Sequence, residues 1–348
     1  MKKRLGDYIK EYSVRNKENQ DIPVYSVTNT EGFCQDYFGK EVASKDKSTY
    51  KIVPQGYFAY NPSRINVGSV DWQRTQERVI VSPLYNVFSV SDKLDQQYLY
   101  YYLKSDFALQ RIKAVATGSV RDNLKLKMLY EFPINIPELS SQKNIVELLD
   151  KIKKIEGLKK AELDYFDTLV KARFVEMFGT PYRNEKGFPM MTVDDIVEFI
   201  GGAQPDKKYF EYEATEDNIR LIQIRDYKTD NYVTYIPKSM AKRFCDVDDI
   251  MIGRYGPPIF QILKGIKGSY NVALMKAIPK AGNKEFIRYF LKQDCLFQYL
   301  DGLSQRTAGQ SGIEMSALKT YPFPYPPIEL QEEFEKFAKQ VDKSKVAE

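Results

Sequence analysis

The stretch "LYEFPINIPELSSQ" at residues 129–142 has a second copy in the chain, "LKTYPFPYPPIELQ" at residues 318–331. Both copies pass from apolar residues through a proline-rich segment to a glutamine that opens a helical pattern. At one constant offset, nine positions keep their chemical class: Leu124/Ile313, Leu129/Leu318, Phe132/Tyr321, Pro133/Pro322, Pro137/Pro326, Gln142/Gln331, Ile145/Phe334, Leu148/Phe337 and Ile152/Val341. A repeat of this length predicts two copies of a domain rather than a solenoid of short units.

The repeat continues upstream in looser form. Three further pairs of stretches correspond: 102–109 with 290–297, 4–9 with 192–197, and 56–64 with 246–254. In the last pair a strand-like run ends in a turn, and the alignment sets Arg64 on Arg254. Runs such as "IPVYSVTN" and "IRLIQIRDY" indicate strands, whereas the stretches near 102–109 and 290–297 have helical spacing. Each copy is therefore predicted to be a mixed α/β domain with an arginine just past a strand.

A long amphipathic helix is predicted between the two copies. Residues 142–178 carry apolar side chains at helical spacing, with a phase adjustment around Gly157. Ser140 and Ser141 can cap its start, and Gly179 follows its end. The second copy repeats the apolar stripe over about half that length. Two such stripes predict antiparallel pairing as a coiled coil, although a stripe buried on its own globular domain is the commoner case.

Several classes of enzyme are excluded by what the sequence lacks. The chain has no histidine, which removes Ser-His and Cys-His nucleophile pairs and most zinc sites. Neither a Walker-type phosphate loop nor a Glu-x-Lys nuclease motif is present. Cys34, Cys245 and Cys295 are odd in number and widely spaced, which indicates reduced thiols and a cytoplasmic location. No apolar run has the length of a membrane span, and the N-terminus lacks a secretory signal.

Charge and aromatic content leave two interpretations open. The net charge is +5, and 26 tyrosines accompany 52 lysines and arginines. Cations and aromatic faces together suit phosphates and bases. Tyrosines in the strands of a β-rich core would account for the same composition.

Three features together resemble the DNA-specificity subunits of type I restriction–modification systems. They are "GYFAYNPSRINVGSV" (56–70), "DIMIGRYGPPIFQILKGIKGSYNVALMKA" (249–277) and the proline-rich exits into glutamine-led helices. The resemblance covers nearly the whole chain. It implies a mixed α/β fold in which two similar target-recognition domains are joined by long helices that form an antiparallel coiled coil. The implied boundaries are 1–140 and 181–328 for the recognition domains, 141–180 for the central helix and 329–348 for a distal helix that is unusually short.

The same resemblance implies a non-catalytic, DNA-binding protein. Each recognition domain would read one half of a split, asymmetric target. Two modification subunits would dock on the helices and bring S-adenosylmethionine, and restriction subunits would join them; the chain itself would hold no cofactor and no metal. The residues expected to carry this docking are Leu149, Ile152, Phe166, Leu169, Phe334 and Phe337.

DNA contacts are expected in the polar turns and loops of both domains. In the first domain the candidates are Asn61, Ser63, Arg64, Arg74, Arg121 and Lys125. In the second domain they are Arg254, Tyr255, Arg306, Gln310 and Ser311. Their donors and acceptors suit base edges and phosphates. Arg64 and Arg254 could equally pair with local carboxylates and brace the fold.

Two other functions fit parts of the sequence. Asn61-Pro62 begins like the (Asn/Asp)-Pro-Pro-aromatic loop of enzymes that methylate the exocyclic amines of flipped bases. Ser63 and Arg64 replace the second proline and the aromatic residue, and no glycine-rich site for S-adenosylmethionine is present. A coiled-coil scaffold that does not bind DNA is the other alternative.

Overall fold

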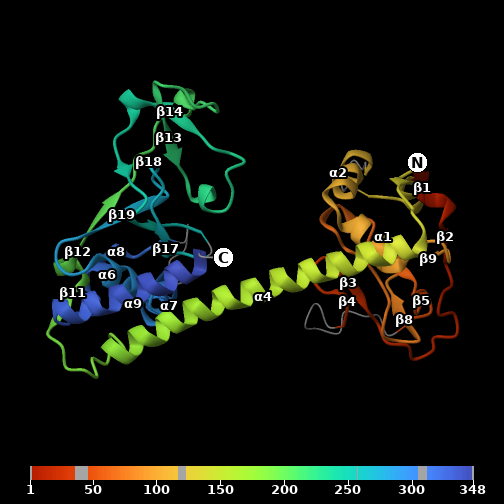
Figure 1. Ribbon diagram of the computed structural model, residues 1–348, viewed down its shortest axis with the longest axis horizontal. Coiled ribbons are helices and arrows are strands. Elements are labelled where there is room, and N and C mark those ends of the chain that lie inside the picture. Colours follow the sequence, from red (N-terminus) through yellow and green to blue (C-terminus); the bar gives the residue numbers. More distant parts are fainter. Residues whose placement is uncertain (1, 36–45, 117–122, 257, 305–311, 347–348) are drawn as a thin grey trace. The chain divides into compact units, whose positions relative to one another are not determined.

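The computed structural model describes residues 2–35, 46–116, 123–256, 258–304 and 312–346 (Figure 1). The chain forms two compact units, Met1–Leu158 and Lys159–Glu348, which we call the first and the second unit. The long helix α4 (Leu139–Phe178) begins in the first unit and ends in the second. Each unit combines sheets with helices, which confirms the predicted mixed α/β fold in two copies.

Each unit contains a four-stranded antiparallel sheet, and the two sheets have the same strand order. The order in the first unit is β2 (Ile9–Glu11), β9 (Asn86–Val90), β6 (Phe58–Tyr60) and β7 (Val70–Trp72). The order in the second unit is β12 (Val197–Gly201), β19 (Leu274–Pro279), β16 (Ile250–Gly253) and β17 (Gln261–Lys264). This common topology is the structural counterpart of the sequence repeat.

Shorter elements complete both units. The first unit adds β1 (Lys3–Arg4), β3 (Ser26–Thr28), β4 (Gly32–Cys34), β5 (Lys51–Pro54), β8 (Arg78–Val81), α1 (Gln96–Lys104), α2 (Asp106–Val115), α3 (Leu126–Tyr130) and β10 (Pro133–Ile134). The second unit adds β11 (Met190–Thr192), α5 (Val193–Ile196), β13 (Asn218–Ile222), β14 (Tyr235–Pro237), β15 (Phe244–Cys245), β18 (Gly268–Tyr270), α6 (Lys284–Leu291), α7 (Asp294–Ser304), α8 (Met315–Thr320), β20 (Pro322–Pro324) and α9 (Ile328–Val346).

The proline-rich exit of each unit pairs with the strand that begins the unit. Strand β10 is antiparallel to β1, and β20 is antiparallel to β11. The next backbone bond is also repeated, because Leu5 N–H donates to Phe132 O (2.9 Å) and Val193 N–H donates to Tyr321 O (3.0 Å). Proline lacks an N–H and is tolerated in such short edge pairings. The two ends of each unit are thereby held together where the following helix begins.

A buried glutamine ties that helix to its unit. Gln142 is fully buried; its Oε1 accepts from the Asp95 N–H (2.9 Å), and its Nε2 donates to Pro137 O (2.8 Å). Gln331 repeats both bonds, accepting from the Asn283 N–H (2.8 Å) and donating to Pro326 O (2.7 Å). Asp95 and Asn283 are the N-cap residues of α1 and α6. One side chain therefore connects the helix start, the proline exit and a neighbouring helix in each unit.

Helix α4 differs from its prediction at the start and agrees with it at the end. It begins at Leu139, and Gln142 N–H donates to Glu138 O (3.0 Å). Ser140 and Ser141 consequently lie inside the first turn, so their predicted capping role is wrong. The helix ends before Gly179, whose φ of +71° is the left-handed conformation that commonly terminates helices.

Helix α9 runs antiparallel to the C-terminal part of α4 (Figure 1). Arg173 of α4 bonds to Glu333 near the start of α9 (3.0 Å), whereas Asp167, nearer the start of α4, bonds to Lys345 near the end of α9 (2.7 Å). The predicted antiparallel helix pair is therefore confirmed for this part of α4.

Aromatic rings fill the core under this helix pair. The Phe174 ring stacks on Phe286 with centroids 5.5 Å apart and meets Phe334 edge to face at 5.3 Å. All three side chains are buried, and aromatic pairs of this kind contribute beyond the area that they bury. The pair of helices is thus an integral part of the second unit.

Replacing Gln142 by alanine is expected to lower the free energy of unfolding of the first unit by about 1–3 kcal/mol, because the partly buried N–H of Asp95 and carbonyl of Pro137 lose their partners. Trp72, the only tryptophan of the chain, lies in the first unit, so its fluorescence during urea denaturation reports on that unit. Gln110→Ala, which removes an exposed glutamine of α2, is the matched control. Equal midpoints for the two variants would contradict a structural role for Gln142.

Candidate nucleic-acid interface

In the first unit a polar turn follows β6. Asn61 Oδ1 accepts from the Ser63 N–H (3.0 Å), and Asn61 O accepts from the Arg64 and Ile65 N–H groups (both 3.0 Å). These bonds fix the backbone of the turn and leave the Ser63 and Arg64 side chains exposed. The Arg64 guanidinium makes no hydrogen bond or ion pair with any residue that the structure describes. The turn therefore presents a positive charge with free donors.

The loop before the proline exit lies beside this turn. Leu124 N–H donates to Pro62 O (3.1 Å), and the buried Tyr60 hydroxyl donates to Leu124 O (3.0 Å). Burial raises the pKa of Tyr60 far above its ordinary value, so the hydroxyl keeps its proton for this bond. Lys125, the next residue, is exposed. Lys125 thus lies near the Asn61–Arg64 turn, whereas Arg121 lies outside the described residues.

The second unit makes the same juxtaposition. Arg254 directly follows β16, and its N–H donates to Ala273 O (2.9 Å). Its guanidinium stands over the Tyr255 ring, 5.2 Å from the ring centre, and Nη1 donates to Val272 O (3.4 Å). Tyr255 bridges to Gly312 of the loop before the proline exit. Arg306, Gln310 and Ser311 of that loop lie outside the described residues.

The sheet register corrects the alignment of Arg64 on Arg254. The first strands of the two sheets pair through Ile9 with Val90 and through Val197 with Pro279. Counting along the sheets from these equivalent pairs, Tyr60 takes the place of Ile252. Arg254 is then two residues beyond this place and Arg64 is four residues beyond it. The alignment is therefore wrong by two residues, and the two arginines occupy different points of their turns.

Arg74 is bonded within the first unit. Its Nη1 donates to Oδ1 of the buried Asp71 (2.8 Å) and to Trp72 O (3.0 Å), and its Nη2 donates to Gln97 Oε1 (3.2 Å). The guanidinium also lies over the Trp72 ring, 4.4 Å from its centre, and 5.3 Å from that of Tyr100. These contacts hold Arg74 in place, as expected for an arginine that braces the fold.

A small cavity of about 60 Å³ opens beside Arg64. Polar side chains from three parts of the chain line it, together with Val27: Ser26, Thr28, Asn29, Asn61, Arg64, Ser69 and Tyr85. The first three belong to β3 and the residue after it, which the sequence analysis interpreted only as a strand. Their signal is the "SVTN" run (26–29), where small polar residues gather at a strand end. No carboxylate lines the cavity.

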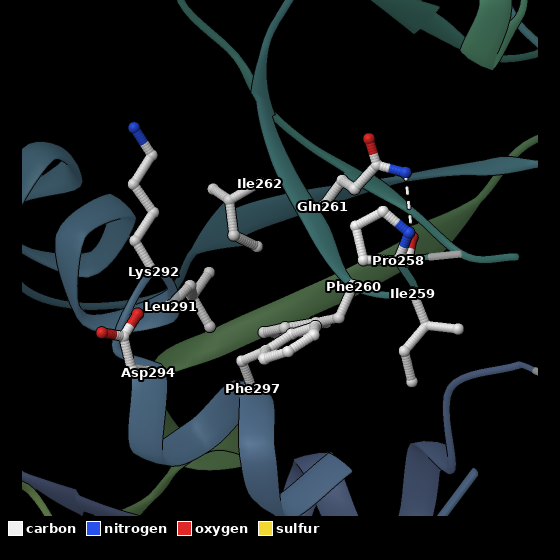
Figure 2. Close-up of a pocket in the computed structure, with 9 residues that line it drawn as sticks. All are labelled: Pro258, Ile259, Phe260, Gln261, Ile262, Leu291, Lys292, Asp294 and Phe297. Carbon is white, nitrogen blue, oxygen red and sulfur yellow. Dashed lines mark hydrogen bonds between the residues drawn. The ribbon is translucent and has the colours of Figure 1, made fainter. Parts of the chain in front are cut away.

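A different hollow lies in the second unit, between residues 258–262 and the junction of α6 and α7 (Figure 2). Phe260 and Phe297 are among the residues that line it, and Gln261 Nε2 donates to Pro258 O (2.9 Å). Its walls are mainly apolar. It therefore lacks the converging donors that phosphates and base edges require.

The predicted docking residues differ in their exposure. Ile152 is 43% exposed, Leu149 is half-buried, and both lie in the N-terminal part of α4. Three of them are half-buried against the core of the second unit: Phe166, Leu169 and Phe337. Phe334 is completely buried among aromatic rings of that core, so its prediction as a docking residue is wrong.

The repeated apolar stripe is covered in α9 and uncovered in the first part of α4. Phe334 and Val341 of α9 are 0% and 7% exposed, because α9 packs on its own unit. Their counterparts in α4, Ile145 and Ile152, are 39% and 43% exposed. Further along α4, Ile155 is 65% exposed. An open apolar seam of this kind marks an interaction surface.

Within the described parts of the chain, no group of three or more potential ligand residues is placed to hold a metal ion. None of the helices in these parts combines the length and the apolar character of a membrane span.

Comparison with known protein families finds the same family at two places in the chain. The sequence model of the "Type I restriction modification DNA specificity domain" matches residues 3–165 and again residues 185–347. The two matches correspond to the two copies recognised from the sequence.

Solved structures of similar fold cover the whole chain at low identity. One, described as "Structural basis underlying complex assembly and conformational transition of the type I R-M system", has a TM-score of 0.54 at 18% identity and is covered over 91% of its length. The type I restriction–modification S subunit from M. genitalium has a TM-score of 0.54 at 14% identity, with 90% covered. The HsdS subunit from Thermoanaerobacter tengcongensis has a TM-score of 0.40 at 17% identity, with 90% covered. The two structures above 0.5 support the same fold.

Arg74→Ala is expected to lower the free energy of unfolding of the first unit by about 1–2 kcal/mol, since the buried Asp71 loses a charged partner. Arg64→Ala is expected to change it by less than about 0.5 kcal/mol, as is usual for a surface side chain without partners. Urea denaturation followed by Trp72 fluorescence measures both. Equal destabilisation by the two changes would contradict the distinction between a bracing and a free arginine.

Proposed function

The chain belongs to the type I restriction–modification DNA specificity family, and from this premise we propose that it is the subunit that reads a split DNA target. The observation that carries the proposal is the occurrence of the specificity domain twice in one chain. Each unit would read one half of the target. Two segments would supply the contacts in each unit. One is the polar turn after the third strand across the sheet, which is β6 or β16, and the other is the loop before the proline exit.

The two units differ where they would meet DNA, which favours an asymmetric target. The first unit has Asn61, Ser63 and a free Arg64 after its strand, whereas the second has Arg254 stacked on Tyr255. Arginine donates two parallel hydrogen bonds to the O6 and N7 atoms of guanine in the major groove. A guanidinium stacked on a ring is held in one plane, which suits that contact. We therefore assign base reading to Arg254.

The open stripe of α4 would receive the modification subunits. Ile145, Ile152 and Ile155 present apolar surface there, and Leu169 and Phe337 line a shallow groove in the second unit. S-adenosylmethionine would be held by the modification subunits, and restriction subunits would join the same assembly. The specificity chain itself would perform no chemistry, so its role would be to place the methyltransferase on the correct sequence.

The methyltransferase alternative gains no support from the Asn61-Pro62 turn. In methyltransferases of this class, the amide or carboxylate accepts from the target amine. Here Asn61 Oδ1 already accepts from the Ser63 N–H (3.0 Å). A non-DNA scaffold remains testable, because DNA binding through phosphates weakens steeply with salt. Absence of salt-sensitive binding to duplex DNA by the assembled complex would favour that alternative.

Arg254→Ala is expected to weaken the reading of one half of the target by about 1–3 kcal/mol, the usual value of a bidentate arginine–guanine contact. The target is first identified from the methylation motif of cells that carry the system. Binding of the assembled complex is then measured on duplexes in which each half is scrambled in turn. Arg183→Ala, an exposed arginine elsewhere in the second unit, is the control. Equal loss of discrimination at both halves would contradict one-half reading by each unit.

Ile152→Asp is expected to abolish co-purification with the modification subunit, because a carboxylate in an apolar contact is strongly unfavourable. Lys151→Asp introduces the same group at the adjacent exposed position outside the stripe and should leave assembly intact. Trp72 fluorescence checks that both variants keep the first unit folded. Normal assembly of Ile152→Asp would show that the stripe is not the docking surface.

A further inference from the structure

We propose that the cavity beside Arg64 is a seat for one backbone phosphate of the DNA, so that this turn contributes affinity and register without reading a base. The inference rests on the proposed function, since it assigns a specific chemical group to a surface already expected to meet DNA. It separates the tasks of the two exposed turns: Arg254 reads a base, and Arg64 holds a phosphate.

Unused hydrogen-bond donors converge on the cavity. The Arg64 guanidinium has five N–H donors and no acceptor. None of these donors is bonded to a described residue, and the side chain lines the cavity. Asn61 uses Oδ1 for the Ser63 N–H, which directs its acceptor into the turn and leaves the Nδ2 donors without a described partner. The hydroxyls of Ser26 and Ser69 likewise have no hydrogen-bond partner among the described residues. A set of donors with one fixed positive charge is typical of a site for an oxyanion.

The surrounding charges favour an anion. None of the residues that line the cavity is acidic. The nearby carboxylate of Asp71 accepts from the Phe33 N–H (3.1 Å) and from Arg74 (2.8 Å), so its charge is already compensated. Lys104 adds a second cation at the edge, because its Nζ donates to the carbonyl of the lining residue Asn29 (2.9 Å). Two cations, Arg64 and Lys104, are therefore placed at the cavity, and none of its lining residues is acidic.

Size and shape favour a phosphate over a base. The cavity is small, at about 60 Å³. A base edge also lies at the floor of a groove about 8.5 Å deep, where only a protruding side chain reaches it. Backbone phosphates stand on the outside of the duplex and can enter a recess. A concave site lined by donors is thus matched to the backbone.

Among the described residues, the second unit has no counterpart of Arg64 at the equivalent place of its turn. The sheet register places Gly256 where the first unit has Arg64, and Gly256 has no side chain and a φ of +95°. The proposed phosphate contact through Arg64 therefore belongs to the first unit. It would anchor one half of the complex on the duplex while the other half is read through Arg254.

The test compares Arg64→Ala with the unchanged chain, both assembled with the modification subunits, on duplexes carrying the methylation motif or a scrambled sequence. Affinity should fall roughly tenfold on both duplexes, as expected for the loss of one charged hydrogen-bonding contact. The slope of the logarithm of the binding constant against the logarithm of salt concentration should become shallower by about 0.9, the value for one phosphate. Asn61→Asp, which keeps the turn acceptor and places a negative charge at the cavity, should weaken binding further.

A scan with single neutral methylphosphonate linkages identifies the contact directly. One linkage should weaken binding of the unchanged chain and have no effect on Arg64→Ala. Arg78→Ala removes an exposed arginine of β8 that does not line the cavity, and should keep the sensitivity to that linkage. Trp72 fluorescence confirms folding of every variant.

Two results would overturn the phosphate seat while leaving the proposed function intact. One is loss of discrimination at a single base pair by Arg64→Ala with an unchanged salt slope, which would make Arg64 a base reader. The other is unchanged binding by both cavity variants. Failure of the unchanged complex to distinguish the motif from the scrambled duplex would instead reject the proposed function, and the phosphate seat with it.

Discussion

A fully buried glutamine at the start of a helix organises each unit. The carboxamide of Gln142 accepts from the N–H of the α1 cap and donates to Pro137 O, and Gln331 repeats both bonds in the second unit. An amide buried without partners is costly, so the three segments that it joins must be positioned together. The proline exit, the helix that follows and the helix beside it are therefore fixed as one group. The direction in which each helix leaves its unit depends on this group.

The same frame supports different turns. The four-stranded antiparallel sheets that contain β6 and β16 share their strand order. In both units the turn after that strand lies against the loop before the proline exit. The side chains placed there are unrelated: a free Arg64 beside a donor-lined cavity in one unit, and Arg254 on the face of Tyr255 in the other. Loops on a rigid scaffold can vary without disturbing the core. A duplicated chain can thereby acquire two distinct recognition surfaces.

The paired helices show how burial depends on the surroundings of a residue. Phe334 and Ile145 occupy equivalent places of the repeat, yet Phe334 is enclosed by rings of its own unit and Ile145 is 39% exposed. The stripe of α9 is covered because α9 packs beside the end of α4. The first part of α4 has no such helix among the described residues. Its apolar side chains are consequently exposed.

Local pattern determined the duplication, the mixed α/β class, the long helix and the importance of the glutamine-led exits, because periodicity and repeated residues are properties of neighbouring positions. Tertiary structure alone decided the rest. The equivalence of Arg64 and Arg254 was wrong by two residues because register is set by pairing between distant strands. The bracing role of Arg74 depends on Asp71 and Gln97, and the cavity beside Arg64 depends on β3, which is remote in sequence. A side chain's function follows from what surrounds it, and those neighbours are brought together only by the fold.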